Sequence, residues 1–436
     1  MSIPTLQGLQ TALSGLVAEQ AALDTAGNNI ANANTEGYSR ETALLEPNPP
    51  IPIPSISAQT GMGAQLGAGV TVETISRIRN TYLDAQYRTQ NSALSAATAQ
   101  SEVLEQAQSA FNEPSSAGIA SQLSNFWNAW NDLANSPTSE AAKEAVAATG
   151  EQLAKTFNEL SSQLSTISSQ TAEQYNSLVG PQGEVETYAK QIAQLNGQIK
   201  LSEEANQPPN EMLDRRDELL DKLSALANIT VTEQPNHMDT VTFGEAAKPL
   251  VEGTTVNWPQ ELTESSGGRL GALLALNGPK GALTGLQEGL NGVASTLAAT
   301  VNQPLAKQFF SGETAATLAV AVKSPEVQAS GTASPGGNEV AKAEAALRGG
   351  AAEQSYAALV EKVGSDVRTA NDNATNLQTT VSAINDQRES VSGVSLDEEM
   401  TNLITYQRGY QASARTLTAM SEMLETLIEH TGVVGL

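Results

Sequence analysis

The sequence predicts a mainly α-helical, elongated protein with a small β module. Three observations support this fold class. Apolar residues recur at steps of three and four through most of the 436 residues, which is typical of amphipathic helices. Aromatic residues make up only 4% of the chain, which favours long, narrow helical packing over a thick globular core. The period changes to alternating β-type residues only near residues 229–259.

The two ends of the chain carry the most regular apolar stripes. The first stripe comprises Leu6, Leu9, Leu13, Leu16, Leu23 and Ile30, with Gln20 and Gly27 at the intermediate steps. The second comprises Met400, Leu403, Tyr410, Ala414, Leu417, Leu424 and Ile428, with Gln407 and Ser421 between them. Both have the spacing of a coiled-coil seam, and a Ser395–Glu398 capping box opens the second helix. We therefore expect the terminal helices to pair.

The energetics leave two interpretations of this pairing open. Burying a leucine gives about 1.5–3 kcal/mol, so each stripe gains roughly 10 kcal/mol. Ordering a free segment costs about 1–2 kcal/mol per residue, so a two-helix pair is borderline alone. The termini are then either assembly elements that are ordered by further copies or an ordinary antiparallel pair that closes one domain.

The middle of the chain predicts long helices at about 80–112, 138–228, 271–310 and 339–392, with a short strand at 70–75. Ser136-Pro137-Thr138 breaks the helix before residue 138. Within 138–228, Gly180-Pro181 implies a kink or break, and Pro208-Pro209-Asn210 ends one helical element before the next begins. Phe126, Trp127, Trp130 and Leu133 lie at helical spacing and are interpreted as core. A chain of this length holds two or three domains. The expected division is a terminal coiled-coil domain (1–46 plus 391–436), a rod-like helical domain (47–228, 265–310 and 339–390) and a small β and loop module (229–264 plus 311–338).

The composition excludes several function classes. A formal net charge of −25 without a Lys/Arg cluster argues against nucleic acid and against an anionic membrane surface as partners. The absence of cysteine excludes disulfides and thiolate chemistry. No N-terminal secretory signal and no membrane-spanning apolar run is recognisable, so the expected location is the cytoplasm, or outside the cell after export without a cleaved signal.

Residues suited to catalysis are few. The histidines are His237 and His430, and neither has a partner at metal-binding spacing. The acidic residues 397–399 fit the first turn of a helix, where they complement its dipole. The charged residues at 214–218 are interpreted as a solvated, salt-bridged helix face. No catalytic, cofactor or metal site is predicted.

One motif carries a family resemblance. It runs from Asn28 to Arg40 and contains Asn28, Asn29, Asn32, Asn34, Thr35, Gly37 and Tyr38. Asn and Gly tolerate left-handed backbone geometry, so the motif predicts an ordered helix-to-loop transition. It resembles the N-terminal signature of bacterial flagellar rod, hook and hook-associated proteins. The segments 210–226 (NEMLDRRDELLDKLSAL) and 386–428 resemble the hook-associated protein 1 family, the first hook–filament junction proteins.

The resemblance implies a structural axial component of the flagellum that serves motility. It implies a ring of copies between hook and filament, type III export to the extracellular flagellum, and a reduced outer domain. The implied partners are further copies of the chain, the hook protein, the second junction protein and an export chaperone on the C-terminal helix.

The alternatives are a hook or rod protein, a secreted type III coiled-coil protein, and an enzyme. The long middle helices argue against the first alternative, because hook proteins are mostly β between their termini. The Asn-Thr-Glu-Gly-Tyr motif argues against the second, and the lack of a catalytic set argues against the third.

Overall fold

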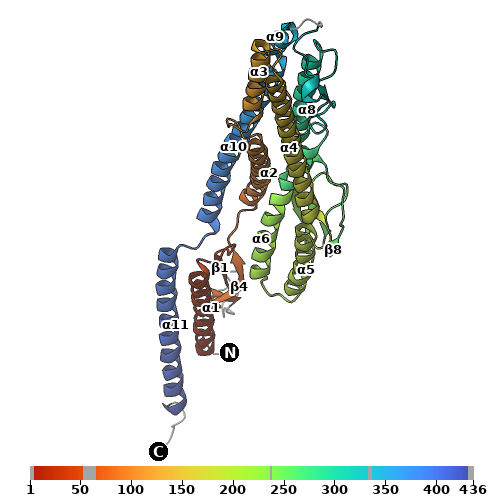
Figure 1. The fold of residues 1–436 in the computed structure, drawn as a ribbon. Coiled ribbons are helices and arrows are strands. Elements are labelled where there is room, and N and C mark those ends of the chain that lie inside the picture. Colours follow the sequence, from red (N-terminus) through yellow and green to blue (C-terminus); the bar gives the residue numbers. More distant parts are fainter. Residues whose placement is uncertain (1–3, 53–64, 236–237, 332–335, 431–436) are drawn as a thin grey trace, which may run out of the picture.

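The computed structural model describes residues 4–52, 65–235, 238–331 and 336–430. The molecule is long and narrow (Figure 1), with the first and last helices at one end and a bundle of long helices at the other. The expected mainly α fold with small antiparallel sheets is confirmed.

Helices account for most of the described chain. They are α1 (Pro4–Asn32), α2 (Thr81–Phe111), α3 (Ile119–Asn135), α4 (Glu140–Val179), α5 (Glu184–Glu204), α6 (Asn210–Leu226), α7 (Gly268–Asn277), α8 (Ala282–Asn302), α9 (Glu339–Ala345), α10 (Ala351–Ser392) and α11 (Leu396–His430). The strands are β1 (Glu41–Pro47), β2 (Ile51–Pro52), β3 (Gln65–Leu66), β4 (Val70–Arg77), β5 (Ile229–Glu233), β6 (Asp239–Phe243), β7 (Val251–Glu252), β8 (Thr255–Val256), β9 (Phe310–Ser311) and β10 (Ala319–Val320).

The helical body has one large core that α2, α3, α4, α8 and α10 share. The predicted aromatic cluster lies at its far end, where Phe126 and Trp130 pack on Phe309 with ring centroids 5.4 and 5.7 Å apart. These side chains are almost fully buried, which confirms their interpretation as core. The α3–α9 end lies farthest from the terminal helices (Figure 1).

A second core lies beside the first, nearer the terminal helices. It joins α5 and α6 to a four-stranded antiparallel sheet of order β5-β6-β7-β8. The segment 311–338, which the sequence grouped with this sheet, instead places Ala315, Leu318 and Val327 in the first core. The two segments of the expected β and loop module therefore lie in different parts of the body.

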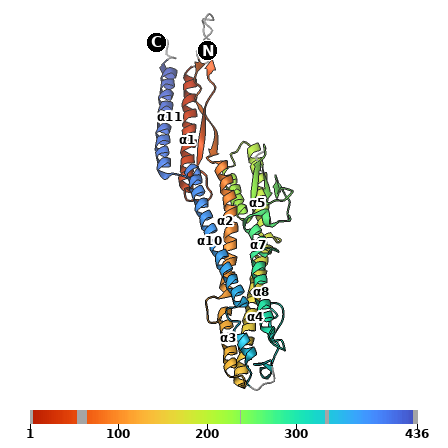
Figure 2. The same cartoon turned by 90° about the horizontal axis from the view of Figure 1, so that it is seen from above.

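The terminal helices form a unit with a β-hairpin. Strands β1 and β4 pair antiparallel from Glu41–Arg77 to Pro47–Val70, with a register shift between Leu44 and Leu45. Both strands contact α1, and α1 lies alongside α11 in both ribbon views (Figures 1 and 2). The expected domain boundary after residue 46 falls inside this hairpin.

Two expected helices are interrupted. The segment 271–310 is divided at Gly278–Gly281, and α8 ends at Asn302, whose side-chain oxygen accepts the N–H groups of Phe309 and Phe310. The segment 339–392 is divided between α9 and α10, where Gly349 has φ +72. The first break has extended backbone at Gly278 and Gly281, and the second has left-handed geometry at Gly349. The prediction of continuous helices was wrong at both places.

Candidate functional site

The terminal helices α1 and α11 approach each other through small residues. Three glycines mark the contact: Gly8 faces Met420, Gly15 faces Ser413, and Gly409 faces Glu19. A Cβ atom on Gly8 would lie 2.8 Å from the sulfur of Met420, and one on Gly15 would lie 3.2 Å from Oγ of Ser413. The helices are antiparallel, and glycine permits their close approach.

The predicted apolar stripe of α1 lies beside this contact face. Ala12, Ala18, Ala22 and Ala26 are the buried apolar residues of α1. Leu9, Leu16, Leu23 and Ile30 are half-buried, while Leu13 is 48% exposed; the side chain of Leu6 lies outside the described residues. The stripe is offset by one residue from Gly8 and Gly15, and one residue turns a helix by about 100°.

The predicted stripe of α11 is divided in the same way. Leu403, Tyr410, Ala414, Leu417 and Leu424 are half-buried, whereas Met400 and Ile428 are 54% and 76% exposed. The structure therefore brings the two helices together, but not with their predicted stripes as the buried seam.

Asn29 links three parts of the terminal unit. Its side-chain nitrogen donates to the backbone oxygen of Glu41 at 2.9 Å and to Oε2 of Glu399 at 3.2 Å. Its side-chain oxygen accepts the hydroxyl of Tyr38 at 2.8 Å and the N–H of Glu41 at 2.9 Å. These four bonds use the full hydrogen-bonding capacity of an amide side chain. Asn29 is 1% exposed and ties α1 to the hairpin and to α11.

Tyr38 is held as a donor in this cluster. Its burial, and then the nearby carboxylate of Glu41, raise the pKa of the Tyr38 hydroxyl. The phenol therefore keeps its proton and donates to Asn29.

The rest of the signature builds the turn that follows α1. Asn32 donates to the backbone oxygen of Asn28 at 3.1 Å, and Thr35 donates to the side chain of Asn32 at 3.2 Å. Gly37 has φ +80, a conformation that favours glycine. Asn28 reaches Glu41 at 3.5 Å, and Asn34 is exposed. The predicted helix-to-loop transition is confirmed.

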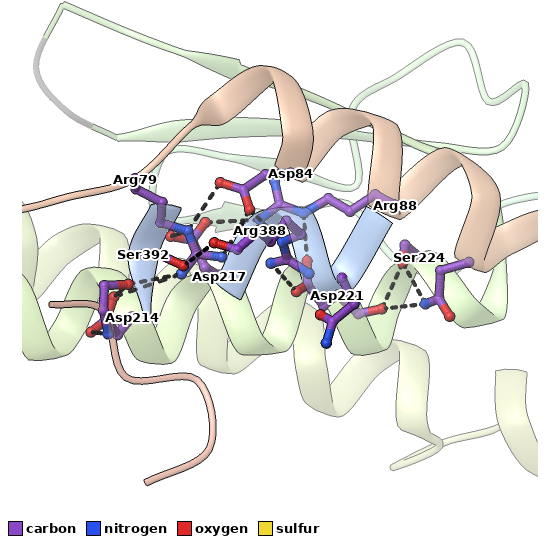
Figure 3. Close-up of polar contacts among 12 residues, drawn as sticks. Arg79, Asp84, Arg88, Asp214, Asp217, Asp221, Ser224, Arg388 and Ser392 are labelled. Atoms are coloured by element: carbon purple, nitrogen blue, oxygen red, sulfur yellow. Dashed lines mark hydrogen bonds and ion pairs between the residues drawn. The ribbon is translucent and has the colours of Figure 1, made fainter. Parts of the chain in front are cut away.

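The turn is fastened to the helical body at Ser39. The N–H and the hydroxyl of Ser39 both donate to the Asp214 carboxylate of α6, at 2.9 and 2.7 Å. Arg77 at the end of β4 binds Asp214 at 2.9 Å and Asp217 at 2.5 Å. Arg79, in the connection to α2, binds Asp84 at 3.0 Å (Figure 3). The hairpin and the signature loop therefore meet on one face of α6.

The same face of α6 also binds the long helices. Arg88 of α2 binds Asp217 and Asp221, each at 2.8 Å. Arg388 of α10 binds Asp84 and Asp221, each at 2.8 Å (Figure 3). Its guanidinium group also stacks over the ring of Tyr87, 4.2 Å from the ring centroid. Arg79 also lies 3.7 Å from Asp214 and 3.6 Å from Asp217. Asp214, Asp217 and Asp221, at steps of three and four along α6, thus meet arginines from four separate positions. We call these acids and arginines the junction network.

The junction network corrects one prediction. Asp214, Arg216 and Asp217 are buried, at 8%, 3% and 7% exposure, so the interpretation of 214–218 as a solvated face was wrong for them. Glu218, in contrast, lies nearer solvent and pairs with Arg215 and with Lys222. The spacing of the acids indicated one face, but the arginines that bury it come from distant segments.

The electrostatics of Asp217 follow from this arrangement. Burial alone would raise its pKa, but the surrounding guanidinium groups of Arg79, Arg77 and Arg88 lower the pKa far below its usual range. Asp217 is therefore ionised at any physiological pH, and each of its partners has a buried counter-charge.

The start of α11 is joined to the same region. Arg40 binds Glu398 at 2.7 Å, and its N–H donates to the backbone oxygen of Ser392, the last residue of α10. Ser395 accepts the N–H of Glu398 at 3.5 Å, as its capping role predicts. Glu399, expected only to complement the helix dipole, is buried and bound to Asn29.

A polar cleft lies between the signature loop, α6 and the second half of α10. Three of its acids already have cationic partners: Glu218 binds Lys222, Asp221 binds Arg388, and Glu398 binds Arg40. In the described part of the chain, no three His, Cys, Asp or Glu side chains are arranged to hold a metal ion. His237 lies outside the described residues, as does the side chain of His430.

Three family models match the chain. The model described as "Flagellar hook-associated protein FlgK helical domain" matches residues 104–258. The models "Flagella basal body rod protein" and "Flagellar basal body rod FlgEFG protein C-terminal" match residues 9–38 and 386–429, which cover most of α1 and α11.

Flagellar hook-associated protein 1 of Bacillus subtilis is 30% identical over 99% of this chain and 99% of its own length. The chain belongs to the flagellar hook-associated protein 1 family. The Escherichia coli member is 29% identical over 57% of this chain and 43% of its own length. A solved structure of the flagellar hook junction protein FlgK from Burkholderia pseudomallei covers 50% of this chain and 43% of its own, with a TM-score of 0.45 and 25% identity.

Membership of the hook-associated protein 1 family makes the chain a structural component of the flagellar axis, at the junction between hook and filament. The family is a structural one and not a class of enzymes. Every helix in the described ranges is too short or too polar to cross a lipid bilayer.

Proposed function

We propose that the chain assembles with copies of itself through the outward faces of α1, α11 and the β1–β4 hairpin. One observation carries this proposal. Of the large apolar side chains that are exposed in the described ranges, eight lie on the terminal helices: Leu13, Val17, Leu396, Met400, Ile404, Met423, Leu427 and Ile428. Three more, Leu44, Leu45 and Ile51, lie on the hairpin strands, and only Tyr82 and Leu201 lie elsewhere.

Such a concentration of exposed apolar side chains is typical of an interaction surface. A second copy is the occupant that we favour, because the rod-type models match these two helices. The predicted stripes then act as assembly seams between molecules, through Leu13, Leu16, Met400 and Ile428 among others. The hook protein and the second junction protein are the proposed neighbours on either side of the ring.

In the proposed assembly, the terminal unit forms the inner tube and the helical body forms the outer wall. The hairpin belongs with the terminal unit in this assembly, because both its strands lie along α1. The junction network then transmits force between tube and wall. Its paired charges are buried, so loss of one partner is costly.

The last turns of α11 expose apolar side chains that an export chaperone can cover. Gly8 faces Met420, so the helix beyond that point runs past the start of α1, and Met423, Leu427 and Ile428 are 56%, 46% and 76% exposed. We propose that a chaperone covers this end before type III export to the extracellular flagellum without a cleaved signal. A titration of the 396–430 peptide with such a chaperone would test this step.

Immunogold electron microscopy tests the assembly proposal. Wild-type protein should label the boundary between hook and filament, and the Leu13→Asp variant should be absent from it. Normal incorporation of this variant would contradict assembly through the α1 stripe.

A further inference from the structure

Helix α1 has two faces that compete for the contact with α11. One carries the small residues Gly8, Gly15 and Ala22, and the other carries the leucine stripe, offset by about 100°. Burial of leucine releases more free energy than burial of alanine or glycine. Without another constraint, the pair would therefore bury the leucine stripe of α1. Leu13 of the stripe and the nearby Val17 nevertheless remain 48% and 54% exposed.

The contacts between the hairpin and α1 fit only one rotation of α1 about its own axis. Ser14 accepts the N–H of Val70 at 3.3 Å, and Gly69, with φ +90, lies against Thr11 and Ser14. At the other end of the helix, Asn29 both donates to and accepts from the backbone of Glu41. The two attachments lie on the same side of α1 and fix its rotation about its own axis.

Asn29 extends this attachment to α11. Its bond to Glu399 joins two side chains that are 1% and 3% exposed. A turn of α1 by one residue would replace Asn29 with Ile30 and leave the carboxylate of Glu399 buried without a donor from α1. An unpaired buried carboxylate is strongly unfavourable. A single polar pair in a helix seam can specify one arrangement in this way.

We infer that Asn29, held by the backbone of Glu41 and paired with Glu399, is a positioning residue that locks the rotation of α1 and keeps its leucine stripe off the face that contacts α11. The lock works through geometry within one chain. That the stripe then meets a second copy rests on the proposed function, but the lock itself does not.

The chain has no cysteine, so single cysteines report the orientation of α1 cleanly. Leu13→Cys probes the outward stripe. Ala18→Cys probes the hairpin side, because Ala18 is 1% exposed and lies one turn from Ser14. In dilute full-length protein we expect a maleimide to modify the Leu13→Cys variant about tenfold faster than the Ala18→Cys variant.

The combined change Asn29→Leu and Glu399→Leu should reverse this order, since rotation protects position 13 and exposes position 18. Unchanged rates would overturn the lock. So would fast labelling at both positions, because that result indicates loosening without rotation. Circular dichroism on the same samples measures the retained helix.

A single substitution separates the contribution of α11 from that of the hairpin. Glu399→Leu alone leaves three bonds of Asn29 to Tyr38 and Glu41, so the original labelling order should persist. A reversal in this variant would show that α11, and not the hairpin, sets the rotation, and would overturn the inference. If the Glu399→Leu variant keeps the original labelling order but does not incorporate into flagella, that result counts against the proposed function and not against the lock.

Discussion

Asn29 and Glu399 are 370 residues apart in the sequence, and their side chains form a buried hydrogen bond of 3.2 Å. The bond closes the chain at the point where the terminal helices leave the helical body. The signature asparagine is thereby explained by its four hydrogen bonds, to Glu41, Tyr38 and Glu399.

The Asn29→Ala variant should loosen the terminal unit. It leaves Glu399 and the backbone of Glu41 without their partners, which costs about 1–3 kcal/mol. Amide hydrogens of α1 should then exchange roughly 5- to 150-fold faster, as hydrogen-exchange mass spectrometry can measure. The control is Asn34→Ala in the loop that follows α1, because Asn34 is exposed. Equal effects of the two variants would contradict the role of Asn29.

The Asp217→Ala variant should destabilise the junction strongly. It leaves the buried guanidinium groups of Arg77 and Arg88 without their shared carboxylate, at about 3–5 kcal/mol. The neighbouring Glu218→Ala change breaks only pairs with partly exposed Arg215 and Lys222 and should cost less than about 1 kcal/mol. Urea unfolding followed by circular dichroism compares them, and similar midpoints would refute the structural importance of the junction network.

Glu344 in α9 should make the stability of the body depend on pH. Its carboxylate is fully buried without a hydrogen-bond partner among the described residues, and burial raises its pKa from 4.5 to about 8. Between these values the unfolded chain loses the proton while the folded chain keeps it. Stability should therefore fall as pH rises through this window, by up to about 1.4 kcal/mol per pH unit.

The Glu344→Gln variant should lack this contribution to the pH dependence. Urea unfolding at several pH values between 5 and 8 provides the measurement, with Glu361→Gln on the exposed part of α10 as the control. Parallel pH profiles for wild type and Glu344→Gln would show that Glu344 ionises without hindrance in the folded protein.

The Leu13→Asp variant should separate assembly from folding. Leu13 is 48% exposed, so the purified protein should melt within about 2 °C of wild type, since surface changes are usually within ±0.5 kcal/mol. Incorporation into flagella should be lost. Tyr82→Asp, at a 73% exposed site on the body, is the matched control and should incorporate normally. Leu424→Asp should also block incorporation, but Leu424 is half-buried, which makes its effect on folding larger.

The terminal helices should be less stable than the body in a free molecule. On α1 the contact relies on Gly8, Gly15 and buried alanines, which bury little apolar area, whereas the body buries Phe126, Trp130 and Leu123 completely. Amides in α1 and α11 should exchange faster than those in α3 and α4 in dilute protein, and assembly should slow them. Equal protection in the free molecule would favour the closed helix pair over an assembly element.

Periodicity predicted the elements well because each depends on local sequence. Asn80 caps α2 through the N–H groups of Tyr82 and Leu83, and the breaks after α3 and α4 follow Ser136 and Gly180, as the sequence indicated. The signature loop was placed correctly for the same reason. Glycine at 37 and asparagine at 32 act within a few residues of themselves.

Rotation and burial could not be predicted in this way. The stripe that has the best heptad spacing on α1 is not the face that meets α11, because Asn29 and the hairpin set the orientation. The sequence indicated that Asp217 is a surface charge, whereas in the structure arginines from β4 and α2 surround it.

The amino-acid sequence by itself determined that this protein has helical ends, an ordered asparagine-rich turn and a flagellar family signature, because each is encoded in spacing or in a contiguous motif. Only the tertiary structure decided which face of each terminal helix is inside and which charges are buried. Those outcomes depend on contacts between residues hundreds of positions apart, and local periodicity contains no information on which distant partner neutralises a charge or turns a helix.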